Sequence, residues 1–232
     1  TATGIVASIY YQDIITSIDV LFEFFKKQNF KAVLFYYHGG EATRHPKVVD
    51  VLKYIHQKGA EYGIKAYNEM QTNLTIKEDK LREILEHSDL FNISLHYKDL
   101  LRLNKLKDFD RNWGVLKELG IEIHNFDIMM ENVDANDHIY NNGKQIPLDP
   151  DDFYNRIVEY LKYDKIVNSE MIYGFCHYKY PPEIEKRHMD FYKKYNKTEQ
   201  LYEIDGETYT TNDLFKKGVD SRGWLCAAGQ ES

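Results

Sequence analysis

The sequence predicts an α/β fold in which a parallel sheet forms a partial (β/α)6 barrel of TIM-like type. Short runs rich in β-branched and aromatic residues alternate with longer segments of helical period, a pattern typical of repeated strand–helix units. About five such strands are recognisable, or six if the first residues of the chain form one, which is fewer than the eight of a closed barrel. The 232 residues are also a common length for a single α/β domain.

Each expected element has its own local signal. Strands are expected where apolar runs are short and rich in β-formers, at residues 31–37, 63–69, 90–96, 121–130 and 165–174. Helices are expected where apolar residues recur every three or four positions, at residues 18–27, 47–59, 75–88, 110–120 and 149–163. In the second helix Pro46 falls beside the first turn, and Gly59 is expected to end it. These units form a core at residues 1–180, with functional side chains expected at the carboxyl ends of its strands.

The end of the chain departs from this alternation. It predicts a helix, a hairpin and a second short helix, at residues 181–195, 202–210 and 211–218. The dipeptide Asp205-Gly206 favours a hairpin turn, and Thr211 or Asn212 can cap the short helix. We therefore expect a helix–hairpin–helix appendage at residues 181–232.

The composition excludes several classes of protein. The chain has 37 Asp and Glu and 30 Lys and Arg, so its net charge is −7. A generic nucleic-acid binder instead needs a basic surface to displace counterions. The sequence has no apolar run of about 18 residues, and its first residues lack the basic and apolar regions of a signal peptide. We expect a cytoplasmic protein with neither a membrane nor a nucleic-acid partner, and the sequence leaves its oligomeric state open.

The chain contains two cysteines, Cys176 and Cys226. Two thiols cannot form a disulfide framework, a four-cysteine zinc site or an iron–sulfur cluster held by cysteines of this chain alone. Cys176 follows the last strand of the expected core and is predicted to be a small buried residue.

The most informative stretch is the turn after the first expected strand. There the chain runs into Gly39, Gly40 and Glu41. Paired glycines let the backbone approach a ligand closely or take positive φ angles, and a carboxylate at the sheet edge can bind an ammonium group. An isolated G-G-E would more simply be a glycine turn with a solvated glutamate.

Three motifs in order resemble the radical S-adenosylmethionine (SAM) family, particularly its SPASM or twitch branch. Residues 39–46 read GGEATRHP where the family has G-G-E-P-T-x-H-P, so Ala42 replaces the first proline. The next two strands lead into Q-T-N at residues 71–73 and I-S-L at residues 93–95, as in the family. The resemblance implies SAM contacts from the glycines and glutamate to the methionine amino group, from the Q-T-N segment, and from the serine toward the ribose: Gly39, Gly40, Glu41, Thr72, Asn73 and Ser94.

The same resemblance reveals a departure at the N-terminus. The family carries C-x3-C-x2-C there, usually followed by an aromatic residue, and these thiolates hold a 4Fe–4S cluster. With Tyr11 at the aromatic position, Thr3, Ala7 and Tyr10 stand where the three cysteines should be. None of them can replace a soft thiolate, so neither the cluster nor its radical chemistry is expected in this chain. In the final G-W-L-C-A-A-G, Cys226 matches the first ligand of the family's auxiliary-cluster region.

The sequence leaves three functions and the substrate open. The first function is a cluster-free pseudoenzyme that binds SAM or a peptide. The second is a trimmed piece of an active radical SAM enzyme that modifies a peptide. The third is a metal-dependent barrel hydrolase or isomerase, with His38 as the first choice among the histidines because it precedes the glycine turn. Ligands for that metal would come from the strand ends: His38, Glu41, Glu69, His96, His124, Asp127 and Glu131.

Overall fold

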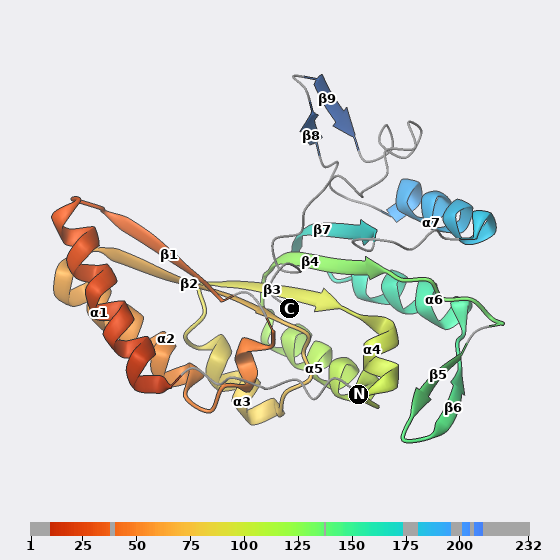
Figure 1. Cartoon of the computed structure of the whole chain (residues 1–232), viewed down its shortest axis with the longest axis horizontal. Helices are drawn as coiled ribbons and strands as arrows, with labels where there is room; N and C mark the ends of the chain where they lie inside the picture. Colours follow the sequence, from red (N-terminus) through yellow and green to blue (C-terminus); the bar gives the residue numbers. More distant parts are fainter. Residues whose placement is uncertain are drawn as a thin grey trace. The chain divides into compact units, whose positions relative to one another are not determined.

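The computed structural model describes residues 10–37, 40–136, 138–173, 181–195, 201–204 and 207–210. It confirms the α/β class, because helices alternate with a five-stranded parallel sheet of order β1-β2-β3-β4-β7 (Figure 1). In that order the strands span Ala32–Tyr37, Lys65–Thr72, Leu90–Leu95, Ile123–Met130 and Ile166–Tyr173. The sixth strand expected from the first residues falls outside the described part of the chain.

Contacts divide the chain into two compact units. The first unit comprises Thr1–Ser94 and Lys107–His124, and the second comprises Leu95–Leu106 and Asn125–Ser232. The first unit holds β1, β2 and most of β3, together with the 3₁₀ turn η1 (Ala42–Arg44). It also holds the helices α1 (Tyr11–Lys27), α2 (Val48–Tyr62) and α3 (Glu78–Leu85), and most of α5 (Leu106–Leu119). The second unit holds α4, α6 and α7, at Tyr97–Arg102, Pro150–Leu161 and Pro182–Tyr195. It also holds the strand pairs β5–β6 and β8–β9, at His138–Asn141, Lys144–Pro147, Leu201–Ile204 and Glu207–Thr210.

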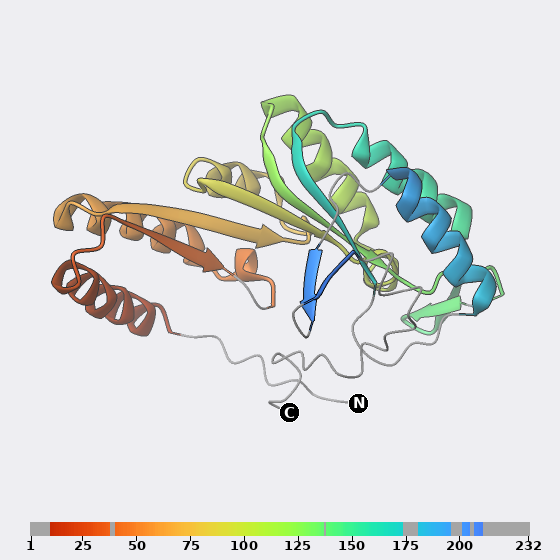
Figure 2. The ribbon, with the colours of Figure 1, turned by 90° about the horizontal axis from the view of Figure 1, so that it is seen from above.

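In the first unit, α1 and α2 lie side by side along one face of β1 and β2 (Figures 1 and 2). Their core includes Phe22, which is fully buried and stacks on Phe35 of β1 with ring centroids 5.6 Å apart. Burying a side chain of this size stabilises the fold by about 1.5–3 kcal/mol. Because side chains alternate along a strand, Leu34 and Tyr36 point to the opposite face, and both are about half exposed.

The second predicted helix runs one turn further than expected. Helix α2 continues through Tyr62 and is capped by Gly63, which has a left-handed φ of +67°. Gly59 has a different role, because a Cβ at that position would lie 2.8 Å from both the Ala66 Cβ and the Ile64 carbonyl oxygen. The prediction that Gly59 ends the helix was therefore wrong, since this glycine permits close packing of the helix on β2.

The appendage is described in part. Helix α7 confirms the helix expected at 181–195, and β8 and β9 pair antiparallel as the predicted hairpin requires. The Asp205-Gly206 turn and the short helix at 211–218 lie outside the described residues. The hairpin β5–β6 was not predicted, although its turn residues Asn142 and Gly143 both have the positive φ angles that such turns favour.

In the second unit, α6 and α7 pack through aromatic rings. The hydroxyl of Tyr154 lies 2.7 Å from Nδ1 of the buried His188, and the Tyr154 ring centroid lies 4.9 Å from that of Phe191. At the start of α6, the Asp149 carboxylate accepts hydrogen bonds from the Asp151 and Asp152 backbone nitrogens. Among the described helices none is both long and apolar enough to span a bilayer.

Candidate ligand site at the sheet edge

The three sequence motifs follow or close three neighbouring strands. Strands β1, β2 and β3 are parallel, so their carboxyl ends lie at one edge of the sheet. The register pairs Tyr37 with Met70 and Thr72 with Ile93, which brings the G-G-E loop next to Q-T-N and Q-T-N next to I-S-L. The structure therefore gathers at one sheet edge the motifs that the sequence predicts to act together.

The loop after β1 leads into Glu41 through a left-handed residue, a position that suits glycine. Gly40 has a φ of +59°, and an added Cβ would meet nothing within 4 Å, so the conformation rather than the space calls for glycine. The chain then enters η1, where the Arg44 nitrogen donates to the Glu41 carbonyl oxygen at 3.0 Å. Gly39 lies outside the described residues.

The carboxylate of Glu41 is held by side-chain and backbone donors. Its Oε1 accepts hydrogen bonds from the hydroxyls of Thr43 and Thr72, the latter at 2.8 Å. Its Oε2 accepts one from the backbone nitrogen of Asn73 at 2.8 Å. Since a carboxylate offers about four acceptor positions, these contacts with described residues leave one position on Oε2 for a further donor. Thr43 and Thr72 are buried, whereas Glu41 is partly exposed, so that position can meet a ligand.

The segment that binds Glu41 is itself clamped. The Asn73 side-chain oxygen accepts from the Thr75 hydroxyl at 2.6 Å and from the Thr75 nitrogen at 3.2 Å. The Arg44 guanidinium donates to the Thr75 hydroxyl at 3.3 Å, which ties η1 to the same turn. These contacts hold the Asn73 nitrogen in position for Glu41.

A second hydrogen-bonded chain connects Q-T-N to I-S-L. The Gln71 Nε2 lies 2.7 Å from the hydroxyl of Ser94, and the Tyr36 hydroxyl donates to the Gln71 Oε1 at 2.7 Å. Ser94 is buried, in keeping with its place near the end of a central strand. Sequence reasoning quoted Gln71 within its motif but gave it no role, and the alternation of polar residues along β2 is the signal that could have found it.

Comparison with known proteins adds little to this geometry. A solved domain of a pyruvate-formate lyase-activating enzyme from Bacteroides vulgatus is similar to this chain, with 16% identity and a TM-score of 0.43. The match covers 69% of this chain and 93% of that domain. No family model and no curated protein sequence matches the chain. The fold assignment thus rests on the sheet and its helices, and the site on the contacts given above.

The expected cluster positions are described only in part. Tyr10 precedes α1, where its carbonyl oxygen accepts from the nitrogens of Asp13 and Ile14, and the residue is 79% exposed. The remaining positions lie outside the described residues, as do the two cysteines: Thr3, Ala7, Cys176 and Cys226. By residue type, no thiolate is available at any of the three N-terminal positions, so these residues do not fit a 4Fe–4S cluster.

Two of the carboxylates considered as metal ligands accept hydrogen bonds from side-chain amides. Glu69 accepts a hydrogen bond from the Asn92 side-chain amide at 2.6 Å, and Asp127 accepts one from the Asn125 side-chain amide. Within the described ranges no group of three or more His, Cys, Asp or Glu side chains is placed to hold a metal ion. His96 precedes α4 and His124 lies in β4, while His38 is outside the described residues.

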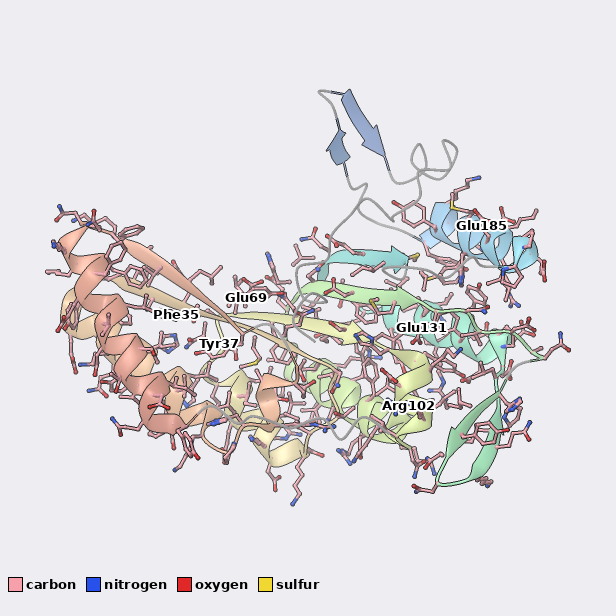
Figure 3. All side chains as sticks on the ribbon, viewed as in Figure 1. Phe35, Tyr37, Glu69, Arg102, Glu131 and Glu185 are labelled. Atoms are coloured by element: carbon pink, nitrogen blue, oxygen red, sulfur yellow. The ribbon has the colours of Figure 1, made fainter. Side chains whose placement is uncertain are left out.

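Glu131, which follows β4, is a partly buried carboxylate with a raised pKa. Its Oε2 accepts from the Lys98 backbone nitrogen at 2.7 Å, at the start of α4 (Figure 3). Burial raises the pKa of Glu131 to about 7, and the hydrogen bond from Lys98 acts in the opposite direction.

Proposed function

We propose that this protein is a SAM-binding relative of the radical SAM enzymes that lacks their cluster chemistry, a pseudoenzyme that binds SAM or a peptide. The observation that carries the proposal is the contact of Glu41 with Thr72 and Asn73. It joins the G-G-E and Q-T-N motifs, which the family resemblance assigns to one ligand, around a single carboxylate.

In this proposal Glu41 binds the methionine ammonium group of SAM. The open acceptor position on its Oε2 provides the hydrogen bond, and its charge makes that bond stronger than a neutral one. Thr72 and Asn73 position the carboxylate. Gly39 and Gly40 let the backbone pass close to the ligand, and Ser94 lies toward the ribose.

The proposal also implies that this chain carries out no radical chemistry. In the radical SAM family the cluster supplies the electron that cleaves the sulfonium. Because Thr3, Ala7 and Tyr10 carry no thiol, these positions offer no thiolate for that cluster, and bound SAM is expected to stay intact. Its role would then be to bind SAM, or to present a peptide or partner with SAM in place.

Calorimetric titration of the full chain with SAM tests the proposal. Glu41→Gln keeps the shape and the acceptor oxygen but removes the charge, so SAM should bind at least about tenfold more weakly. Glu23→Gln, the same change on an exposed residue of α1, should leave SAM binding unchanged. The proposal fails if SAM shows no saturable binding to the unmodified chain or binds Glu41→Gln equally well.

A further inference from the structure

A second polar site lies on the sheet face that α1 and α2 leave uncovered. Figure 3 shows Glu69 on the side of the sheet away from these helices, whereas Phe35 and Tyr37 point toward them. The register pairs Tyr36 with Glu69 and Gln71 with Asn92, and partners in a parallel pair share a face. Polar side chains from three strands therefore meet here: Tyr36, Glu69, Gln71, Asn92 and Ser94.

Asn92 is the unusual member of this group, because it is buried with one half of its amide unpaired. The residue is only 4% exposed, and its Nδ2 donates to the Glu69 Oε1 at 2.6 Å. A carboxylate accepts hydrogen bonds only, so this contact fixes which amide atom is nitrogen. The other atom, Oδ1, is buried and has no hydrogen-bond partner among the described residues. Buried acceptors are rarely left unpaired, so Oδ1 calls for a donor from outside the described fold.

Glu69 and Tyr36 define what kind of donor fits. Glu69 is partly exposed, and among the described residues the hydrogen bond to its carboxylate comes from Asn92 alone, so acceptor positions on the carboxylate remain open. The ring of Tyr36, on the paired position of β1, is 49% exposed. An anionic acceptor, an amide oxygen and an aromatic ring complement a group that is cationic and carries several N–H donors.

We propose that Glu69, Asn92 and Tyr36 bind the primary ammonium group of a second ligand, such as a lysine side chain or a small alkylamine. An ammonium has three donors, which can serve the Glu69 carboxylate and the Asn92 oxygen together while the cation faces the Tyr36 ring. A neutral hydroxyl would satisfy the acceptors but not the charge.

This position is separate from the proposed contact of Glu41 with the SAM ammonium group, whereas Ser94, proposed to lie toward the ribose, shares the sheet face of Asn92. Glu69 precedes Thr72 by three residues, about 10 Å along β2, and the two side chains point to opposite faces of the sheet. The Glu41 carboxylate accepts a hydrogen bond from the Thr72 hydroxyl, on the sheet face to which Thr72 points. The inference rests on the proposed function only in treating the amine as the partner of SAM, because the amine site itself is built from other residues.

Calorimetric titration with Nα-acetyl-lysine methylamide and with n-butylamine tests the amine site. Both probes should bind the full chain saturably, and Nα-acetyl-norleucine methylamide, which lacks the ammonium, should not bind. Glu69→Gln retains an acceptor for Asn92 but loses the charge, so amine binding should weaken at least about tenfold. Binding should remain unchanged in Glu23→Gln. Binding of n-butylamine alone would limit the site to small amines, which is still the ligand class proposed.

The inference is wrong if neither amine binds, if the norleucine analogue binds equally well, or if Glu69→Gln binds the amines as the unmodified chain does. The two proposals fail in different ways. Loss of amine binding in Glu69→Gln with SAM binding retained supports a separate amine site. Amine binding in a chain that does not bind SAM overturns the proposed function and leaves the amine site standing.

Discussion

The Oε2 atom of Glu41 lies 2.8 Å from the backbone nitrogen of Asn73, a residue 32 positions later in the chain. Hydrogen bonds to an ionised carboxylate are shorter and stronger than neutral ones. This contact therefore joins the turn after β1 to the turn after β2 at the sheet edge. The position of the Glu41 carboxylate consequently depends on the conformation of Thr72 and Asn73 at the end of β2.

Replacing Thr72 by valine should loosen Glu41. The Thr72 hydroxyl donates to the Glu41 Oε1 and accepts from the Leu74 nitrogen at 3.1 Å, and both contacts would be lost in a buried place. We expect Thr72→Val to lower the free energy of unfolding by about 1–3 kcal/mol and to weaken SAM binding. Urea denaturation and SAM titration measure the two effects. Thr72→Ser, which keeps the hydroxyl, should restore both, and equal SAM affinity in valine and serine variants would rule out a positioning role.

Asn112 of α5 should be essential for the turn after β2. It is fully buried, and its Nδ2 donates to the carbonyl oxygens of Leu74 and Ile76 at 2.7 and 2.8 Å. Asn112→Leu has a similar volume but leaves two buried carbonyls without this donor, so we expect a loss of about 2–4 kcal/mol. Asp110→Leu on the same helix tests whether the effect is specific to Asn112. A loss below about 1 kcal/mol in thermal or urea unfolding of Asn112→Leu would contradict the role assigned to it.

Two glycines within helices should respond to alanine with opposite signs. At Gly59 a Cβ would come within 2.8 Å of the Ile64 backbone oxygen, so Gly59→Ala should destabilise the protein by about 1–3 kcal/mol. At Gly114 of α5 a Cβ would meet nothing within 4 Å, so Gly114→Ala should stabilise it by up to about 1 kcal/mol. Differential scanning calorimetry of the two variants checks the signs. Stabilisation by both changes would mean that α2 does not pack on β2 as described.

Glu131 should make the stability fall as the pH rises toward neutrality. Its folded pKa of about 7 lies above the ordinary value of 4.5, so between these values the folded state binds the proton more tightly than the unfolded state. This contribution is fully present below pH 4.5 and is lost as the pH passes through about 7. The loss amounts to about 3 kcal/mol at most, by the usual conversion of a pKa difference.

The variant Glu131→Gln isolates the contribution of Glu131 to the pH dependence of stability. Its neutral amide can still accept the hydrogen bond from the Lys98 backbone nitrogen. We expect Glu131→Gln to match the unmodified chain near pH 4 and to be more stable than it at pH 8, as measured by urea denaturation across that range. The difference between the two curves removes the contributions of all other groups. Equal stability at pH 8 would show that the folded-state pKa of Glu131 is not raised.

The sequence predicted the regular elements well where the signal was local. The helices expected at 18–27 and 181–195 are present, and all five recognised strands pair in the parallel sheet. The prediction failed at Gly59, because glycine within a helix resembles a stop signal until the neighbouring strand is known. The β5–β6 hairpin was missed although its Asn142-Gly143 turn is a strong local signal.

For the site, the sequence pointed to strand ends that the structure brings together, but not to the contacts between them. It identified Glu41, Thr72 and Asn73 as neighbours of one ligand, and the structure brings these three together. It assigned no role to Asn92 and considered Glu69 only as a metal ligand, because neither residue belongs to a motif. Which side chains meet on a sheet face depends on strand register, and residue order does not reveal that register.

The sequence by itself determined the alternation of strands and helices, the G-G-E turn, and the absence of thiols at Thr3, Ala7 and Tyr10. These properties are local or compositional, so they can be read without knowing how the chain folds. Only the tertiary structure decided that Thr72 binds the carboxylate of Glu41 and that Asn92 binds that of Glu69. Those pairs are 31 and 23 residues apart and come together because neighbouring parallel strands set their register through backbone hydrogen bonds.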